Sequence, residues 1–387
     1  MTTKTTDDPR VTKVLTFKSG KVAFSRNHDW SKAFGTLGII DGAYAALSSL
    51  PILPSFAGKL ETDLIRRAIF GTAAIEGNPL SEERVGEILE EPTLDGLRDR
   101  AEQEIVNLKE AYRLHSSTLP DKHDQHLLIS EDFIRAINER VTRGVGGDLH
   151  TPGMYRDHAV YVGNAEHGGT YTPPKIRADI ETLMAAFVDW MNSDDMRTEL
   201  VPVRAALAHY HLALIHPFGD GNGRTARLLE VAILAHAAYE YIPTMLSNYY
   251  YRNVDAYYLA FRQCETSKSY GMTPFITFVL EGLQQSMLEL HDIISGHIRL
   301  LALGGHYRKL REDKDITQRQ HDLLLILLQS PQRPLEPSAL RTDPHLAPLY
   351  RKTSDSTPRR DLKRLLELQL LLPAEGGGYR LNEFTLG

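Results

Sequence analysis

HPFGDGNGRTAR, the stretch from His216 to Arg227, holds one histidine, one acid, three glycines and two arginines in twelve residues. The preceding residues, VPVRAALAHYHLALI, have apolar side chains at helical spacing. Pro217 disfavours α-helical geometry at His216, so this helix is expected to end there. The apolar run LLEVAILAHAAY then continues a second helix that begins near Arg224. The stretch is therefore predicted to be a loop that joins two helices.

The composition of this loop favours an anionic ligand. Gly221 and Gly223 permit unusual backbone dihedral angles, and their N–H groups can form an anion cradle with the N-terminus of the second helix. Arg224 and Arg227 are three residues apart and should share one face of the first helical turn. Cations at a helix N-terminus oppose the helix dipole, so two of them there favour an anion that bridges both. A polyphosphate is the clearest candidate.

Two further side chains of the loop suit phosphate chemistry. Asp220 cannot ligate phosphate, but it could hold the Mg²⁺ that usually accompanies a polyphosphate. Beside a phosphoryl group, a neutral His216 could take a proton from an attacking hydroxyl, a role worth about 10²–10⁴ in rate. Taken singly, a histidine before proline is ordinarily a helix end and GNG an ordinary turn, so the prediction depends on their combination. The stretch matches neither the P-loop pattern nor a GxGxxG that follows a strand.

The stretch resembles the signature of the Fic family, HxFx(D/E)GNGRxxR. It matches every fixed position of that signature: His216, Phe218, Asp220, Gly221, Asn222, Gly223, Arg224 and Arg227. The typical activity of the family is transfer of AMP from ATP to a hydroxyl side chain of a protein, with release of pyrophosphate. The related Doc kinases carry lysine at the position of Gly223, so this glycine argues against phosphorylation. The resemblance covers about residues 35–290.

The resemblance implies a role for each residue of the motif. His216 would be catalytic and activate the target hydroxyl, while Asp220 would hold Mg²⁺ on the α- and β-phosphates. Asn222 and the GNG amides would cradle phosphate, and Arg227 would meet the γ-phosphate. In SNYYYRNVDAYYLAF, where the family places adenine contacts, two tyrosines are candidates, although aromatic residues on helices more often form core. The expected ATP-binding residues are Gly221, Asn222, Gly223, Arg224, Thr225, Ala226, Arg227, Tyr257 and Tyr258.

A second motif lies upstream, at the end of a helix predicted from about Leu60 to Glu76. A negative charge at a helix C-terminus is disfavoured by about 0.3–1 kcal/mol, although a solvated acid would be the ordinary reading of Glu76. TAAIEG also resembles the Fic inhibitory pattern (S/T)xxxE(G/N), with Thr72, Glu76 and Gly77 at its fixed positions. The resemblance implies that Glu76 pairs with Arg227, fills the place of the γ-phosphate and inhibits the enzyme in cis.

The clearest β signal is HAVYVGNAEHGGTYTPP, which reads as a hairpin around a glycine-containing loop. Residues 158–174 lie where Fic proteins carry a flap that docks the target protein by strand pairing. An ordinary surface turn is the alternative interpretation of this hairpin.

Beyond residue 300, two helical stretches, QRQHDLLLILLQ and STPRRDLKRLLELQLL, precede a hairpin-like LPAEGGGYRLN. This order is that of a winged helix-turn-helix. Basic residues gather around its second helix, with acids among them: Arg351, Lys352, Arg359, Arg360, Lys363 and Arg364. DNA binding and protein docking both remain open for this module.

The chain of 387 residues is too long for one ordinary core. We expect a mainly α fold, in which a Fic-type helical bundle with a β-hairpin flap is followed by a small winged helix-turn-helix domain. The predicted boundaries are 1–35 for a flexible arm, 36–115 for a helical region with the inhibitory helix, 116–300 for the Fic catalytic domain and 301–387 for the winged-helix-like domain.

The composition limits the class of protein further. A net charge of −6 argues against a general polyanion binder, and the lone Cys264 excludes a disulfide framework within the chain. The polar start lacks the apolar core of a signal peptide, and no apolar run reaches the roughly 18 residues that span a bilayer. We therefore expect a cytoplasmic protein without a membrane partner.

Taken together, the sequence predicts an autoinhibited protein adenylyltransferase that uses ATP and Mg²⁺ and modifies a target protein and itself. One alternative is a DNA-binding regulator whose Fic domain senses nucleotide, and another is removal of AMP from modified proteins. The intact His216 favours the enzyme, because sensing needs only the phosphate cradle. A homodimer and DNA are partners that the sequence leaves open.

Overall fold

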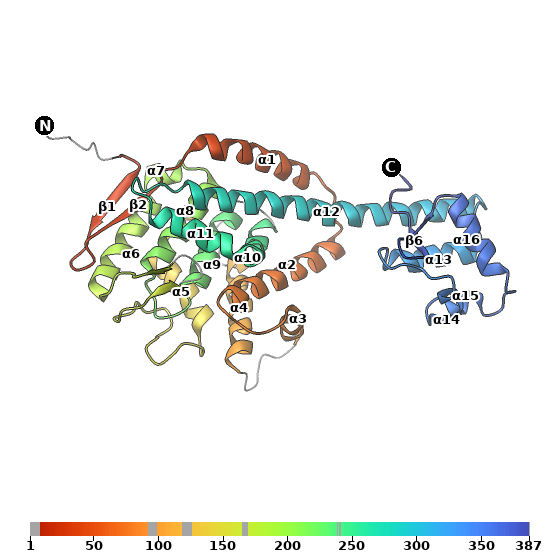
Figure 1. The fold of residues 1–387 in the computed structure, drawn as a ribbon, viewed down its shortest axis with the longest axis horizontal. Helices are drawn as coiled ribbons and strands as arrows, with labels where there is room; N and C mark the ends of the chain where they lie inside the picture. Colours follow the sequence, from red (N-terminus) through yellow and green to blue (C-terminus); the bar gives the residue numbers. More distant parts are fainter. Residues whose placement is uncertain are drawn as a thin grey trace. The chain divides into compact units, whose positions relative to one another are not determined.

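The computed structural model describes residues 8–91, 99–117, 126–164, 169–237, 239 and 241–386. The chain forms two compact units, one of Met1–Ser49 with Leu53–Leu290 and one of Leu50–Ile52 with His291–Gly387 (Figure 1). Helices dominate both units, and the strands of the described residues form two-stranded ribbons only. The predicted mainly α fold is therefore confirmed.

The first unit is a helical bundle with two β-hairpins. Its elements are β1 (Val11–Leu15), β2 (Lys21–Ser25), α1 (Trp30–Ser48), α2 (Pro54–Ile75), α3 (Glu82–Glu90), α4 (Arg100–Ser117), α5 (Glu131–Thr142), β3 (Val162–Asn164), β4 (Gly169–Tyr171), α6 (Arg177–Met191), α7 (Asp194–Arg197), α8 (Val201–Ile215), α9 (Asn222–His236), α10 (Ile242–Arg252) and α11 (Val254–Glu265). Helix α12 (Thr273–Glu312) begins in this unit.

Helices α8 and α9 form the centre of this bundle, and their neighbours hold the loop between them in place (Figure 1). Almost every residue of both helices is buried, including polar residues such as Arg204, His209 and Glu230. Helix α2 packs closely against α10, because a Cβ at Gly71 would lie 2.8 Å from the backbone of Asn248. This packing fixes the end of α2, where the predicted inhibitory motif lies.

Residues 11–25 form a hairpin, whereas the polar sequence predicts a flexible arm over residues 1–35. The hairpin is anchored by Phe24, which is fully buried and packs with its ring centroid 5.6 Å from that of Trp190. Asp179 accepts hydrogen bonds from the backbone of the hairpin turn, including 2.7 Å from Ser19 N–H. The hairpin is attached by one buried aromatic residue, Phe24, and by the acid Asp179 of α6. Because these are only two residues, the polar composition of residues 1–35 does not reveal that the hairpin is ordered.

The predicted flap is present as the antiparallel pair β3–β4, with Val162 opposite Tyr171. Of the range predicted for the flap, residues 165–168 lie outside the described residues. Helix α2 begins at Pro54 rather than near Leu60 and ends at Ile75, one residue before Glu76.

The second unit contains α13 (Gln318–Leu328), α14 (Ala339–Thr342), α15 (Ala347–Tyr350), α16 (Thr357–Glu367), β5 (Leu371–Pro373) and β6 (Tyr379–Leu381), together with the end of α12. It starts at His291 rather than at residue 301 and has its own apolar core, which includes Tyr307, Leu340 and Leu365. The order of helix, helix and hairpin agrees with the sequence, and the winged-helix assignment stays a prediction.

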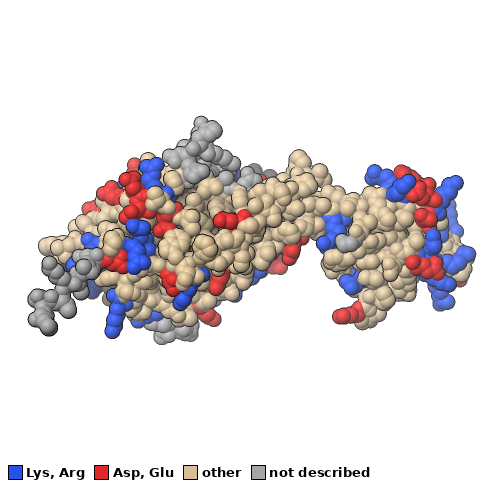
Figure 2. Space-filling model, turned by 90° about the horizontal axis from the view of Figure 1, so that it is seen from above, with Lys and Arg blue, Asp and Glu red and all other residues tan. Residues whose placement is uncertain are grey.

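Charges of both signs are interspersed on the second unit (Figure 2). Arg359, Arg360 and Lys363 are exposed on α16, whereas Asp361 is buried and accepts a hydrogen bond of 2.7 Å from Arg319. The Asp361 carboxylate is therefore directed into this unit and is not part of the exposed basic face of α16. Among the described residues, no helix has the length and apolar character needed to cross a membrane.

Candidate active site

The loop between α8 and α9 starts at a residue with unusual backbone geometry. Helix α8 ends at Ile215, and His216 has φ 51° and ψ 57°, in the left-handed region. A non-glycine residue in this region costs about 1–2 kcal/mol and is retained where the surroundings or the function require it. Since Pro217 follows, the helix end predicted at His216 is confirmed.

Asn222 closes the loop. Its Oδ1 accepts a hydrogen bond of 2.9 Å from Phe218 N–H, and its Nδ2 donates one of 2.8 Å to the Phe218 carbonyl. Phe218 itself is fully buried. The Asn222 side chain therefore holds the loop closed, and the contribution of Asn222 to a phosphate cradle stays a prediction.

Gly221 is required by both conformation and space. It has φ 74°, and a Cβ at this position would overlap the Cγ2 atom of Thr142 in α5. Thr225 and Ala226 are fully buried, and the Thr225 hydroxyl donates to the Gly221 carbonyl at 2.7 Å. These residues shape the first turn of α9, and they do not line the cavity described below.

The hydrogen bond of His216 defines its protonation. Nδ1 lies 3.2 Å from the carbonyl oxygen of Ala213, which can only accept a hydrogen bond. Nδ1 therefore carries the proton, and Nε2 keeps a free lone pair. Burial lowers the pKa of His216 to about 4. The imidazole is thus neutral at pH 7 and has the tautomer that a general base at Nε2 requires.

The carboxylate of Glu76 lies over the N-terminus of α9. A Cβ at Gly223 would overlap Oε1 of Glu76, so this oxygen rests directly against the glycine. The partly exposed N-terminus of a helix attracts an anion through its free N–H groups and its dipole. Glu76 occupies that position in the structure.

Arg227 binds the same carboxylate. It donates hydrogen bonds to Glu76 Oε1 at 2.6 Å, to Thr72 Oγ1 at 2.7 Å and to the Thr72 carbonyl at 3.2 Å. Arg227 is 2% exposed and the Glu76 side chain 31%. Burial alone would raise the pKa of Glu76, but the charges of Arg227 and Arg224 outweigh it, and the pKa is lowered. The structure thus contains the pair that the sequence predicts.

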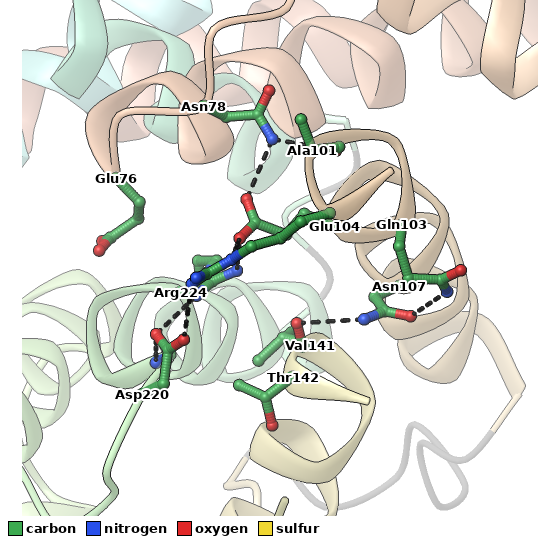
Figure 3. Close-up of polar contacts among 12 residues, drawn as sticks. Glu76, Asn78, Ala101, Gln103, Glu104, Asn107, Val141, Thr142, Asp220 and Arg224 are labelled. Atoms are coloured by element: carbon green, nitrogen blue, oxygen red, sulfur yellow. Dashed lines mark hydrogen bonds and ion pairs between the residues drawn. The ribbon is translucent and has the colours of Figure 1, made fainter. Parts of the chain in front are cut away.

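Arg224 points away from this pair, toward Asp220 and α4 (Figure 3). Its guanidinium donates to Asp220 Oδ1 at 2.9 Å and lies 3.5 Å from Oε1 of Glu104. Their predicted bridging of one anion stays a prediction, and in this structure Arg224 and Arg227 contact different acids. The reason is packing, because Arg227 is buried against α2 and Arg224 faces acids of α4 and of the loop.

Glu104 joins this group to the inhibitory motif. Its Oε2 accepts a hydrogen bond of 3.0 Å from Asn78, two residues beyond Glu76, while Oε1 faces Arg224 (Figure 3). Glu104 is 8% exposed, so both contacts are made in a poorly hydrated setting. The end of α2, α4 and the first turn of α9 are thus connected by buried polar contacts that the sequence did not reveal.

Asp220 is the one acid of the motif that suits a metal ion. Mg²⁺ commonly takes one or two carboxylates from a protein and completes its shell with water and phosphate oxygens. Asp220 is 25% exposed, and among the described residues Arg100, at 3.3 Å, is the recorded partner of its second oxygen, Oδ2. The Arg100 side chain is 64% exposed and is free to turn away. The donor set therefore fits Mg²⁺ bound through one carboxylate. Within the described ranges, no three acids, histidines or cysteines gather to hold a metal by themselves.

A cavity of about 400 Å³ brings the functional residues together. His216, Gly223, Arg227 and Glu76 line one part of it, and the flap contributes Tyr161–Gly163 and Tyr171. The remaining wall comes mainly from α8 and α11: Tyr210, Ala213, Leu214, Tyr257, Tyr258, Phe261, Arg262 and Glu265. Tyr257 and Tyr258, proposed from the sequence for adenine, thus border the same cavity as His216.

Behind this cavity lies a buried polar chain. The Tyr257 hydroxyl is 2.9 Å from Nε2 of His209, whose Nδ1 is 3.0 Å from Oε2 of Glu230, and Tyr250 donates to the same carboxylate at 3.0 Å. A carboxylate only accepts, so Nδ1 of His209 donates to Glu230. The chain fixes the Tyr257 ring at the cavity wall.

Two residues that sequence reasoning missed hold the loop from outside. Asn138 of α5 donates to the carbonyl of Asp220 at 2.9 Å, and Arg156 donates to the carbonyl of His216 at 2.8 Å. Both are buried. A signal for Asn138 was present, since it is a polar residue on the apolar face of α5, whereas nothing near Arg156 identified it.

A histidine with a free Nε2, a helix N-terminus and an arginine around one cavity define a site for a phosphate-containing ligand. Residues 128–234 match the family model described as the Fic/DOC family. This segment is therefore a Fic/DOC domain, and the resemblance drawn from the motif is confirmed for it.

The relatives carry names that agree. The chain is 31% identical over 250 residues to "Protein adenylyltransferase Fic" of Culex quinquefasciatus, which covers 64% of this chain and 46% of that protein. It is 38% identical over 173 residues to "Protein adenylyltransferase fic-1" of Caenorhabditis elegans, which covers 44% of this chain and 32% of that protein. The chain thus spans less than half of the length of these relatives.

Solved structures share the fold. A Fic family protein from Desulfovibrio desulfuricans G20 superposes with a TM-score of 0.55 at 21% identity, covering 91% of this chain and 96% of that one. A fragment of Fic-1 from C. elegans has a TM-score of 0.53 at 24% identity and covers 68% of this chain and 73% of its own. At these identities the likeness concerns the fold.

Proposed function

We propose that this protein transfers AMP from ATP to a hydroxyl side chain of a protein, itself included, and that Glu76 keeps the enzyme inhibited. The observation that carries the proposal is the convergence of His216, the N-terminus of α9 and Arg227 on one cavity. The names of the relatives support the reaction.

In this reaction the target hydroxyl oxygen attacks the α-phosphorus of ATP as Nε2 of His216 takes the hydroxyl proton. The new bond joins this oxygen to phosphorus, the bond to the β-phosphate oxygen breaks, and pyrophosphate leaves. The N–H groups at the start of α9 stabilise the charge that develops on the phosphate. The free lone pair and the neutral state of His216 support this role.

Mg²⁺ would be held by Asp220 and would supply positive charge to the phosphates of ATP. For this to happen Arg100 has to release Oδ2 of Asp220, which its exposed position allows. Arg224 stays on Oδ1 and keeps the carboxylate oriented.

Inhibition follows from the position of Glu76. Its carboxylate lies against Gly223 and neutralises Arg227, so a phosphate of ATP would meet a negative charge in the place where it needs a positive one. ATP binds productively only after this carboxylate has moved. The target segment would dock on the flap, through strand pairing with residues of the range 158–174.

A second candidate is removal of AMP. It is favoured by the fact that Glu76 lines the same cavity as His216, where a carboxylate could orient water. Nucleotide sensing by a DNA-binding regulator is the third candidate, and the exposed Arg359, Arg360 and Lys363 on α16 support a polyanionic partner.

The reaction is tested with ATP labelled either at the α-phosphate or at the γ-phosphate, incubated with the Glu76→Gly variant and Mg²⁺. Transfer of AMP labels the protein from the α-phosphate only. Label that arrives from the γ-phosphate would indicate a kinase. Tight binding of ATP without label from either position would indicate a sensor.

A further inference from the structure

A second cavity of about 730 Å³ lies beside the catalytic one. The two cavities share Tyr171, Tyr210, Leu214 and Glu265 as wall residues. The second cavity, called the β2 groove below, is lined by residues of β2 and by Thr172–Lys175, the segment that follows flap strand β4. A ligand in the β2 groove would therefore lie next to the flap and to the catalytic cavity.

The groove follows an edge of β2 rather than a face. Lys21, Val22 and Ala23 all line it, although they are consecutive residues. Side chains of consecutive strand residues point to opposite faces of a sheet, so a cavity can touch all three only along the edge of the strand. In the part of the chain that the structure describes, β2 pairs only with β1. The edge of β2 that faces away from β1 is therefore open.

The backbone groups along this edge are available for a further strand. Arg26 N–H donates to the Arg10 carbonyl at 3.0 Å, and β1 and β2 pair in the register that places Val11 opposite Ser25. Hydrogen-bonded and non-bonded pairs alternate in an antiparallel ladder, so Lys21, Ala23 and Ser25 direct their N–H and C=O groups away from β1.

Ser25 confirms this direction, because its N–H and C=O groups lie 3.1 and 3.0 Å from Nε2 of His211, which lines the groove. Among the described residues, none is recorded as a hydrogen-bond partner of the outward groups of Lys21 and Ala23. Two residues of β2 thus offer two donors and two acceptors at the spacing that an added strand requires.

The rim of the groove is basic. Lys18, Lys21 and Lys175 are exposed, and their ammonium groups form no ion pair within the described residues. The acid of the wall, Glu265, is already paired with Arg262 at 2.6 Å. The floor includes apolar side chains such as Val22, Pro173 and Met272. In a chain with a net charge of −6, this local excess of cations favours an acidic ligand.

We propose that the β2 groove binds an extended, acidic segment of the target protein by strand addition to β2. This assignment rests on the proposed AMP transfer, since it names the class of target that the enzyme selects. The lysines would act on recognition of the target and not on the chemical step, because they line the β2 groove and not the catalytic cavity.

The first test measures binding by fluorescence anisotropy to the full chain. The probe is a fluorescein-labelled peptide of alternating Glu and Val around one Ser. A second peptide carries Lys in place of Glu, and a third carries Pro at alternate positions, which removes the N–H groups of an added strand. We expect the Glu peptide to bind about tenfold more tightly than either of the others. Equal binding of the Glu and Lys peptides would overturn the acidic class, and equal binding of the Glu and Pro peptides would overturn strand addition.

The second test uses matched charge reversals. Lys21→Glu/Lys175→Glu should weaken binding of the Glu peptide about tenfold. Lys32→Glu/Lys59→Glu changes two exposed lysines outside the groove by the same charge, and it should stay within about twofold of wild type. Equal weakening by both double variants would reduce the effect to net charge and overturn the proposal.

Self-labelling with α-labelled ATP separates the two proposals. If the Glu76→Gly variant fails to label, the proposed reaction fails, while the anisotropy data still decide on the groove. If labelling occurs but the Glu peptide does not bind more tightly than the Lys and Pro peptides, the groove assignment fails and the proposed reaction stands.

Discussion

A guanidinium nitrogen of Arg227 lies 2.6 Å from Oε1 of Glu76, and a Cβ at Gly223 would overlap the same oxygen. One carboxylate thus covers the N-terminus of α9 and satisfies the arginine of its second turn. These two contacts are the structural basis of the proposed inhibition. They also make the account testable residue by residue.

His216→Ala should abolish label transfer from α-labelled ATP, because no other group of the motif can accept the hydroxyl proton. A loss of about 10²-fold or more is expected for a general base. The measurement uses the Glu76→Gly background, so that the rate is high enough to follow. Transfer within about tenfold of the parent would remove His216 from this role.

The pH profile provides an independent check of the same histidine. Burial lowers its pKa to about 4, so the imidazole stays neutral, and active as a base, down to pH values well below its ordinary range. The transfer rate of Glu76→Gly should therefore be nearly flat between about pH 7.5 and 5.5. A histidine with the ordinary pKa of about 6.5 would lose about tenfold at pH 5.5. That steeper fall would contradict the proposed environment.

The magnesium requirement should depend on Asp220 and on Glu104. Asp220→Asn removes the carboxylate and should raise the half-saturating Mg²⁺ concentration by about tenfold or more. Glu104→Gln leaves Arg224 with Asp220 as its remaining acid, so Mg²⁺ must compete with a stronger ion pair, and a smaller increase is expected. Glu110→Gln on the same helix, whose partner Arg143 lies 3.8 Å away at the surface, is the control. An unchanged requirement in Asp220→Asn would exclude this residue as the ligand.

Stability should fall in acid because of His211. This fully buried histidine has its pKa lowered to about 4, mainly by burial, whereas the unfolded chain keeps about 6.5. The unfolded state therefore binds the extra proton first, so the contribution is present above pH 6.5 and is lost as the pH falls toward 4. Between pH 7 and 5 the free energy of unfolding should drop by about 2 kcal/mol from this residue alone.

Tryptophan fluorescence is the suitable probe for this loss, since both tryptophans, Trp30 and Trp190, belong to the first unit. His211→Gln should show a smaller drop between pH 7 and 5 than wild type. A variant with the same pH dependence as wild type would show that His211 is not the group responsible.

The second unit should be separable. It has an apolar core of its own, and the catalytic residues all precede Leu290. A chain that ends near residue 300 should fold, as judged by circular dichroism, and should label itself in the Glu76→Gly background. An insoluble product would indicate that the two units share one core.

The sequence predicted the structural features that depend on residues close together along the chain. Pro217 ends α8 and the glycines permit the turn at Gly221, so the helix–loop–helix geometry followed from local rules. The Glu76–Arg227 pair came from the resemblance, and the structure contains it.

The same local rules do not predict contacts between residues far apart in the sequence. Arg224 contacts Glu104, and Asn222 contacts the backbone of Phe218. Both contacts depend on which groups the packed helices bring close together. The hairpin of residues 11–25 depends on a pocket for Phe24 that α6 and α8 create together. The sequence around Phe24 has no pattern that predicts this pocket, and the sequence around Arg224 has none that predicts its contact with Glu104.

The central claim is that Glu76 blocks AMP transfer by occupying the anion position of α9 and holding Arg227. Self-labelling with α-labelled ATP should be compared in wild type, Glu76→Gly, Glu76→Gln and Arg227→Ala at equal protein concentration. Breaking a buried charge pair ordinarily costs about 3–5 kcal/mol, but here ATP supplies the replacement charge to Arg227.

We predict that Glu76→Gly labels itself strongly and that Glu76→Gln does so less, because it keeps the bulk and loses the charge. Arg227→Ala should remain inactive, since it deletes the partner of the phosphate as well. Equal labelling by wild type and Glu76→Gly would contradict the account.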